Sequence, residues 1–228
     1  AGSRLVVAGM LAGLLALASA PAFAGLVTSR AALGGTDFID WGQLGADSTE
    51  VTSPAAVTSA LGVSASVSNP SGSMWRFDEG GGTFAGNFAA GDQLLSTFFT
   101  EGPVVINFGN AQSRVGAQIQ ANDFGAFSGV IEVYSVLNVL LESWSFDGVS
   151  NDAGDNSAIF IGVSRSSADI DHVSFRITGP ANLDFAINRV DLSDSVPGGT
   201  GLPEPASLAL VGLALTGALV ARRRARPG

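Results

Sequence analysis

The stretch His172-Val173-Ser174-Phe175-Arg176-Ile177-Thr178 decides the fold class, because it alternates polar and apolar side chains without interruption. Val173, Phe175 and Ile177 fall on one face, and polar side chains fall on the other. Successive side chains of a β-strand point to opposite faces of the sheet, so a period of two is typical of a strand with one face against a core. The stretch therefore predicts a half-buried strand.

Strand patterns of this kind recur through the middle of the chain. Alternation is found at 63–67, 115–119 and 183–187, with Gln118 and Gln120 expected to point outward, and apolar runs at 104–108, 129–141 and 158–163 predict more central strands. Turn-forming clusters of Gly, Asn, Asp, Ser and Pro separate them at 69–73, 78–82 and 151–156. We expect an all-β fold, an antiparallel β-sandwich of about eight to eleven strands with a lectin-like jelly-roll topology. One short helix is expected at 53–61.

The first 24 residues have the pattern of a secretory signal peptide. Arg4 precedes an apolar run at 5–17, and Ala22-Phe23-Ala24 supplies an A-x-A ending before Gly25. We expect signal peptidase to cleave between Ala24 and Gly25. Residues 1–24 are then a signal peptide helix and residues 25–196 the exported β-sandwich ectodomain. A permanent N-terminal anchor or a buried helix is the alternative.

The other end of the chain combines a short motif, an apolar segment and a basic end. A linker of Pro, Gly and Thr at 197–202 precedes Pro203-Glu204-Pro205, and residues 206–221 carry no charge. As a helix, these 16 residues would be about 24 Å long, so flanking arginines would have to reach the membrane interface. The segment 203–228 is thus predicted to be a sorting signal with a transmembrane helix at 206–221. Its basic residues, expected to be cytoplasmic, are Arg222, Arg223, Arg224 and Arg226.

This C-terminal segment resembles the PEP-CTERM sorting signal of Gram-negative bacteria, in which Pro203, Glu204 and Pro205 are the name-giving motif. The resemblance implies processing by exosortase near the motif, transient anchoring in the inner membrane, and a final location at the cell surface or in the extracellular exopolysaccharide matrix. An ordinary single-pass anchor with a chance motif is the alternative. The blocks at 36–45, 114–120, 160–163 and 184–188 are also similar to those of PEP-CTERM ectodomains, a group that resembles jelly-roll carbohydrate-binding domains in outline.

Composition excludes several classes of function. The ectodomain has six arginines against nineteen acidic residues, a net charge of −13, and its few positive charges are dispersed. Such a surface offers no footprint for nucleic acid. The chain contains no cysteine, which excludes a thiol nucleophile, a cysteine-ligated zinc and an iron–sulfur cluster.

No set of residues in the sequence predicts catalysis, and we expect the protein to be non-enzymatic. His172 lies beside Asp171, but no G-x-S-x-G motif accompanies it, so a solvated histidine on the polar face of a strand is the expectation. Glu101, Glu132 and Glu142 are candidates for the two carboxylates of a glycoside hydrolase. Their spacing selects no pair, and a secreted hydrolase remains an alternative.

Two groups of oxygen-bearing side chains are candidates for structural calcium, the one cofactor that the sequence suggests. The first lies in one loop and consists of Asp147, Asn151, Asp152 and Asp155; the second would tie the ends of the domain together through Asp37, Asp40 and Asp184. Ordinary solvated acidic turns are the alternative for both groups.

The aromatic residues suggest how the domain could bind a ligand. Trp41 and Trp144 are expected in the core, whereas Trp75 and Tyr134 are the candidate contacts for a glycan, because aromatic planes pack against sugar rings. The function expected from the sequence is therefore an exported surface or matrix protein with an extracellular polysaccharide as partner. A purely structural matrix protein without a small ligand is the first alternative.

Overall fold

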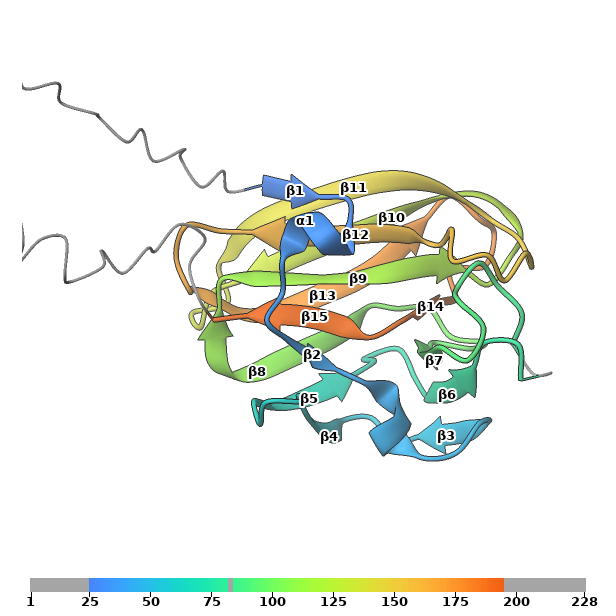
Figure 1. Ribbon diagram of the computed structural model, residues 1–228, viewed down its shortest axis with the longest axis horizontal. Helices are drawn as coiled ribbons and strands as arrows, with labels where there is room; N and C mark the ends of the chain where they lie inside the picture. Colours follow the sequence, from blue (N-terminus) through green and yellow to red (C-terminus); the bar gives the residue numbers. More distant parts are fainter. Residues whose placement is uncertain (1–24, 82–83, 195–228) are drawn as a thin grey trace, which may run out of the picture.

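The computed structural model describes residues 25–81 and 84–194 (Figure 1). The predicted signal peptide at 1–24, the linker at 197–202, the Pro203-Glu204-Pro205 motif, the helix at 206–221 and the basic end lie outside the described residues. Within the described residues, no helix is long and apolar enough to cross a membrane.

The described residues form two antiparallel β-sheets with very little helix, so the chain folds as a β-sandwich (Figure 1). Two short helices lie near the start, α1 (Arg30–Leu33) and the 3-10 helix η1 (Trp41–Leu44). The first sheet contains nine strands: β1 (Gly25–Val27), β2 (Asp37–Ile39), β3 (Thr49–Val51), β6 (Met74–Asp78), β7 (Gln93–Ser96), β9 (Arg114–Ala121), β12 (Ile159–Ser164), β14 (Phe185–Ile187) and β15 (Val190–Ser193). The second contains six: β4 (Ala55–Thr58), β5 (Ser64–Ser68), β8 (Val104–Gln112), β10 (Gly125–Tyr134), β11 (Leu140–Ser150) and β13 (Ile170–Thr178).

The strand order brings distant segments together. The nine-stranded sheet runs β1-β12-β9-β14-β7-β6-β3, with β15 pairing β9 and β2, and the six-stranded sheet runs β11-β10-β13-β8-β5-β4. The chain crosses between the sheets after β3, β5, β7, β8, β9, β11, β12 and β13. Because the connections after β7, β9 and β13 meet at one end of the sandwich, as the pocket described below shows, they can build a site jointly.

The core between the sheets follows from the alternation in the sequence. Val173, Phe175 and Ile177 of β13 are buried there, which confirms the strand predicted from that stretch. They pack against the inward residues of β9, among them Val115 and Ile119. The burial of these side chains is the main favourable contribution to folding, at about 25 cal/mol for each Å² of apolar surface removed from water.

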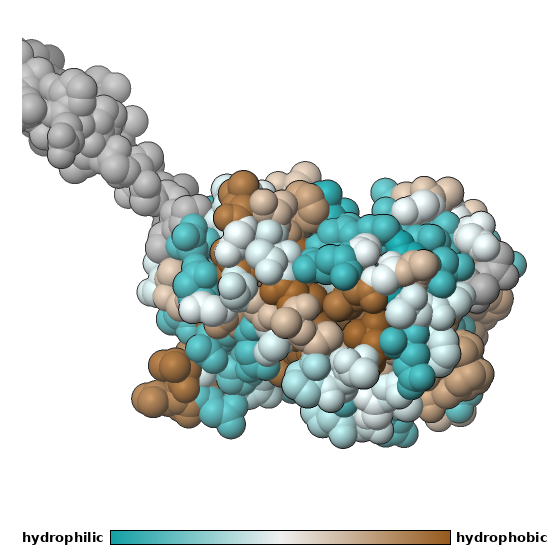
Figure 2. Space-filling view, turned by 90° about the horizontal axis from the view of Figure 1, so that it is seen from below, coloured by the Kyte–Doolittle hydropathy of each residue, from teal (hydrophilic) through white to brown (hydrophobic). Residues whose placement is uncertain are grey.

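A second apolar cluster covers part of the outer face of the nine-stranded sheet. It consists of Phe77, Phe84, Phe88, Leu94, Ala158 and Ala186. Phe84 and Phe88 come from the segment after β6, which folds back over the sheet instead of continuing into it. The sheet is therefore shielded on both faces here. Figure 2 shows another face of the molecule, where polar groups dominate, hydrophobic atoms form a central band, and one hydrophobic group projects at the left end.

Three expectations about elements are wrong. The helix expected at 53–61 is instead strand β4, in which Val57 is buried between exposed Ala56 and Thr58. The run at 129–141 is not one central strand, because the chain turns after Ser135, with Asn138 at a φ of 57°, and continues as the edge strand β11. The described residues also contain more strands than the eight to eleven expected, since several are only three or four residues long.

Candidate functional site

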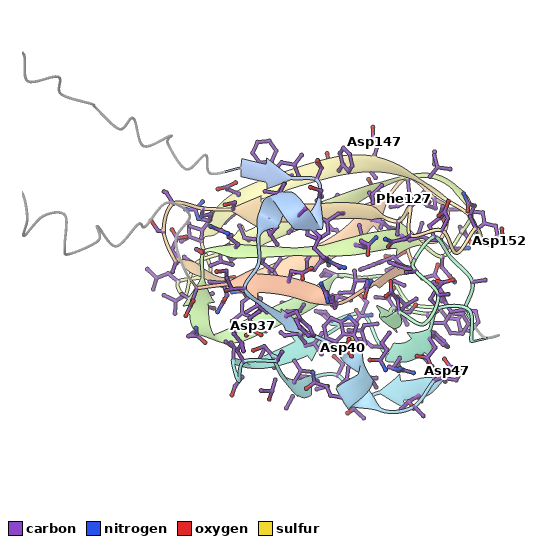
Figure 3. The ribbon with its side chains drawn as sticks, viewed as in Figure 1. Asp37, Asp40, Asp47, Phe127, Asp147 and Asp152 are labelled. Atoms are coloured by element: carbon purple, nitrogen blue, oxygen red, sulfur yellow. The ribbon has the colours of Figure 1, made fainter. Side chains whose placement is uncertain are left out.

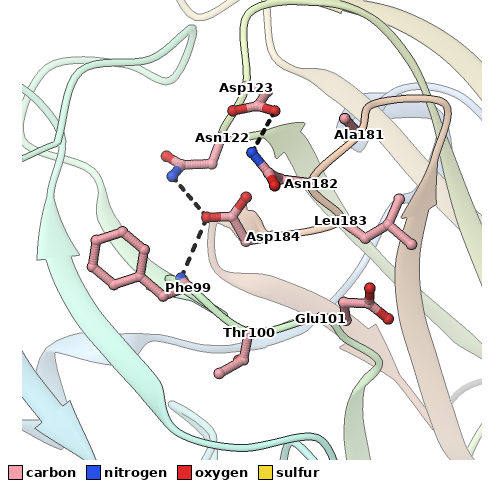
Figure 4. A pocket seen from close by; sticks show the side chains of 9 residues that line it. All are labelled: Phe99, Thr100, Glu101, Asn122, Asp123, Ala181, Asn182, Leu183 and Asp184. Atoms are coloured by element: carbon pink, nitrogen blue, oxygen red, sulfur yellow. Dashed lines mark hydrogen bonds between the residues drawn. The ribbon is translucent and has the colours of Figure 1, made fainter.

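An open cleft of about 340 Å³ lies at the end of the sandwich where three crossing connections meet (Figure 4). Its lining comes from the connection after β7 (Phe99, Thr100, Glu101), from the β9–β10 turn (Asn122, Asp123) and from the connection after β13 (Ala181, Asn182, Leu183, Asp184). A cleft of this size falls within the range of small-ligand sites.

Hydrogen bonds between the connections hold the cleft in shape (Figure 4). Asp184 is buried, and its Oδ2 accepts from the Asn122 amide at 2.8 Å and from the Phe99 backbone N–H at 3.4 Å. The Asn122 backbone N–H donates to the Asp184 carbonyl at 3.0 Å. The Asn182 amide donates to Asp123 Oδ2 at 2.9 Å. Asp184 thus joins all three connections, which fixes the cleft before any ligand arrives.

Phe99 is the unusual residue of the cleft. Its side chain is 83% exposed and its backbone has a φ of 61°, a left-handed conformation that bulky residues seldom adopt. Such backbone strain persists only where the surroundings impose it, and it is concentrated at functional sites. The Phe99 ring lies against the Phe98 ring, with centroids 3.8 Å apart. Phe98 in turn contacts the rings of Trp75 and Phe77.

The structure places the two predicted glycan contacts away from each other. Trp75 on β6 is only partly exposed, because it stacks on Phe77 with centroids 6.1 Å apart and packs against Phe98. Tyr134 lies on β10 of the other sheet, stacked on His172 with centroids 4.8 Å apart. Trp75 therefore supports Phe98 beneath the cleft, and Tyr134 is remote from it.

Neither predicted calcium group is assembled. Within the described residues, no three acidic or histidine side chains come close enough to share a metal ion. Asp37 accepts from the Ser59 hydroxyl and the Leu61 N–H, and Asp40 caps η1 by accepting from the Gly42 N–H. Asp184 is committed to the cleft instead. The structure therefore does not bring these three aspartates together as one group.

The loop that was expected to hold calcium uses its oxygens internally. Asp147 accepts from Ser128 at 2.6 Å on the exposed side of β11, and Asn151 exchanges hydrogen bonds with Asn87. Asp155 accepts from the Ser157 N–H, and bonds from Ser157 lower the pKa of Asp155. Figure 3 shows Asp147 at the top of the molecule and Asp152 at its right edge, so the group is dispersed.

The candidate catalytic residues do not combine. In the pairing of β10 with β11, Glu132 lies opposite Ser143, whereas Glu142 lies opposite the buried Val133. Glu132 and Glu142 therefore point to opposite faces of the sheet, and only Glu101 lines the cleft.

The single histidine is not in a triad either. His172 lies between Asp171, at 3.1 Å from Nδ1, and Asn138, at 3.2 Å from Nε2. Its side chain is only 14% exposed, so it is more enclosed than the solvated histidine expected.

Two expectations about tryptophan have different outcomes. Trp41 is fully buried, and its Nε1 donates to the Asn188 carbonyl at 3.0 Å, which confirms its place in the core. Trp144 was expected there too, but it lies on the edge strand β11 and is 40% exposed.

Comparison with known proteins places the chain in a sorting class. Residues 202–224 match the family model of the PEP-CTERM protein-sorting motif. Proteins with this motif are exported and processed by exosortase. The chain carries a PEP-CTERM sorting motif, as its C-terminal sequence predicted.

Comparison of the folds found distant similarities. A DUF4465 family protein from Bacteroides caccae superposes with a TM-score of 0.42 at 9% identity, over 69% of this chain and all of that one. CsCBM6-3 from Clostridium stercorarium, solved in complex with cellobiose, superposes with a TM-score of 0.31 at 15% identity, over 57% of this chain and 86% of that one. No curated protein sequence matches the chain significantly.

Proposed function

We propose that this exported protein is a non-enzymatic polysaccharide-binding protein of the cell surface or the exopolysaccharide matrix, and that it binds its glycan in the cleft around Phe99. The proposal includes the signal peptide at 1–24, the transmembrane helix at 206–221 and a lectin-like jelly-roll topology for the sandwich.

The observation that carries the proposal is the exposed, strained Phe99. A phenylalanine that is 83% exposed gains little hydrophobic stabilisation unless a ligand covers it, and the apolar face of a sugar ring is a suitable cover. The ring is held by Phe98, which packs on Trp75 and Phe77, so little side-chain freedom remains to be lost on binding. Phe99 thus takes the role of the aromatic glycan contact for which Trp75 was the candidate in the sequence.

The polar lining indicates which glycans fit. Glu101, Asp123 and Asp184 carry carboxylates, Asn122 and Asn182 carry amides, and no arginine lines the cleft. Carboxylate oxygens accept hydrogen bonds from sugar hydroxyls but repel carboxylates or sulfates. The ligand is therefore a neutral polysaccharide rather than an acidic one.

The test is a glycan array followed by calorimetry, using the purified full chain. We expect binding to neutral glycans and a roughly tenfold weaker affinity for Phe99→Ala, equivalent to about 1.4 kcal/mol for one aromatic anchor. Leu137→Ala is the matched control, because Leu137 is 81% exposed but lies in the turn at the opposite end of β10. Absence of any glycan binding, or equal affinity of Phe99→Ala and wild type, would favour a purely structural matrix protein.

In the alternative of a secreted hydrolase, the cleft would be the active site, because Glu101 and Asp123 both line it. Glycosidases of the common types need two carboxylates on either side of the scissile bond. Release of reducing ends from a bound glycan, abolished by Glu101→Gln or Asp123→Asn, would show hydrolysis. We expect no release from the wild type.

A further inference from the structure

Strand β11 is an unusually long open edge. It contains 11 residues and pairs only with β10 among the described strands, so its second side has no partner strand. The other strands with a single partner strand are short, since β1, β2 and β3 have three residues each and β4 has four. Long edge strands expose unpaired backbone N–H and C=O groups that can pair with another strand.

Strand β11 has little of the usual protection of an edge strand. It has no proline and no lysine, its only charged residues are Glu142 and Asp147, and it exposes large apolar side chains: Leu140 at 50%, Trp144 at 40%, Phe146 at 36% and Val149 at 65%. Trp144 and Phe146 share the inner face of the sheet, since they lie opposite Ile131 and Gly129 of β10. In Figure 1, β11 runs along the top of the molecule. An edge of this length with several exposed apolar side chains is typical of a pairing surface.

The sequence of β11 is complementary to itself in one register. When two copies lie antiparallel with Ser145 opposite Ser145, all 11 residues of each strand pair. Trp144 then faces Phe146 of the second copy, and Leu141 faces Val149, and each pair occurs twice by symmetry. Aromatic and aliphatic pairs across strands are stabilising, at about 0.2–1 kcal/mol each.

Charge also favours this register. The two carboxylates of the strand, Glu142 and Asp147, lie opposite Gly148 and Ser143 of the second copy, so no like charges meet. Glu142 is already neutralised by Arg165, whose Nη1 lies 2.6 Å from its Oε1. Registers that centre on Glu142 or on Asp147 would oppose identical carboxylates, which is unfavourable.

We propose that β11 pairs antiparallel with β11 of a second copy, about a two-fold axis through Ser145, so that the two six-stranded sheets become one continuous sheet. This inference concerns the assembly of the protein and does not depend on the proposed glycan cleft. We infer that the partner is a second copy because the sequence of β11 is complementary to itself: its apolar side chains face each other and no like charges are opposed.

The absence of cysteine from the chain gives a direct test. In an antiparallel pair, directly opposed Cα atoms are about 4.5–5.5 Å apart, which lies within the range that a disulfide spans. We expect the full-length Ser145→Cys variant to form a covalent dimer on mild oxidation, seen on a non-reducing gel. Ser64→Cys is the control, because Ser64 is also an exposed strand serine, but β5 has a neighbour on each side.

The register is tested in the same way. Ser143→Cys and Asp147→Cys, in separate chains that are then mixed, are expected to cross-link with each other more than either does with itself. Cross-linking of Ser145→Cys no greater than that of Ser64→Cys would overturn the proposal, as would preferential self-linking of Ser143→Cys. Ser145→Lys provides an independent measure, because two opposed lysines should reduce dimer mass in light scattering while the circular dichroism spectrum stays unchanged.

Discussion

Glu79 is a carboxylate that the fold holds almost entirely out of water. Its side chain is 4% exposed, one oxygen accepts from the Gly86 N–H at 2.8 Å, and the other has no hydrogen-bond partner. Burial raises the pKa of Glu79, and the nearby Asp92 raises it further, against the opposing effect of the Gly86 hydrogen bond. The folded protein therefore favours the protonated form of this group more than the unfolded chain does.

This raised pKa predicts a stability that depends on pH. The stability that comes from protonated Glu79 is fully present below the unfolded pKa of about 4.5 and is lost as the pH rises through the folded value. Glu79→Gln removes the ionisation, so we expect a higher Tm than wild type at pH 7. Each kcal/mol gained in the free energy of unfolding should raise the Tm by about 2–4 °C, and this gain should disappear at pH 4.

Glu50→Gln is the matched control for Glu79→Gln, because Glu50 is an exposed carboxylate whose removal changes the net charge equally. Melting curves of both variants and wild type at pH 4 and pH 7 make the comparison. An equal gain from both variants at pH 7 would assign the effect to net charge and contradict the burial argument.

For single residues, the sequence allowed the chemical role of a side chain to be predicted better than its exposure to solvent. Trp41 and Trp144 are both flanked by small or polar residues, but Trp41 is fully buried, whereas Trp144 lies on a strand whose position at an edge only the sheet order reveals. Phe99 gave no sequence signal, because its importance comes from a left-handed backbone imposed by contacts with residues about 85 positions away.

Among the elements, β9 and β12 meet at two opposed glycines. Gly116 lies opposite Gly162, and a Cβ on Gly116 would be 2.8 Å from the Gly162 Cα and 2.8 Å from the Phe160 ring. The Phe160 ring thus fills the space that two side chains would otherwise take. We expect Gly116→Ala to destabilise the domain by about 1–3 kcal/mol, the usual effect of overpacking.

Urea unfolding of Gly116→Ala measures this loss, with Ser64→Ala as a surface control. Replacing Phe160 by leucine in the Gly116→Ala background should restore only part of the stability, because the contact with the Gly162 backbone remains. A free energy of unfolding for Gly116→Ala equal to that of wild type would show that the strands separate freely at this point.

Elements with alternating side chains could be predicted, and those shaped by neighbours could not. The stretch at 172–178 is a strand with the expected buried face. Gln118 and Gln120 do point away from the core of the sandwich, but loops cover them: Gln118 donates to Asn156 and Gln120 to the Asn151 carbonyl. The period of two gives the face of a side chain, and it contains no information about what later packs on that face.

For the whole molecule, the sorting signal could be predicted from the sequence, and the candidate site could not. The sorting motif is contiguous, so a short pattern is enough to find it. The cleft is built from three connections at 99–101, 122–123 and 181–184, which the crossing of strands between two sheets brings together. Glu101 and Asp184 were noticed in the sequence for other roles, because neither their neighbours nor their spacing shows that they meet.

The dimer and the cleft together predict a bivalent protein. The cleft lies beside the β9–β10 turn, where Gly125 pairs with Ser150 at the end of β11. Because the two β11 strands run in opposite directions, the dimer carries its two clefts at opposite ends. Two sites on one particle raise the apparent affinity for a repeating polymer by about 10²–10⁴-fold.

We expect wild type to agglutinate glycan-coated beads and Ser145→Lys to fail, although both should bind a short oligosaccharide with equal affinity. Oxidised Ser145→Cys should agglutinate as wild type does, whereas Phe99→Ala should bind the oligosaccharide roughly tenfold more weakly and need a correspondingly higher concentration to agglutinate. Agglutination by Ser145→Lys at wild-type concentration would show that agglutination does not depend on β11 pairing.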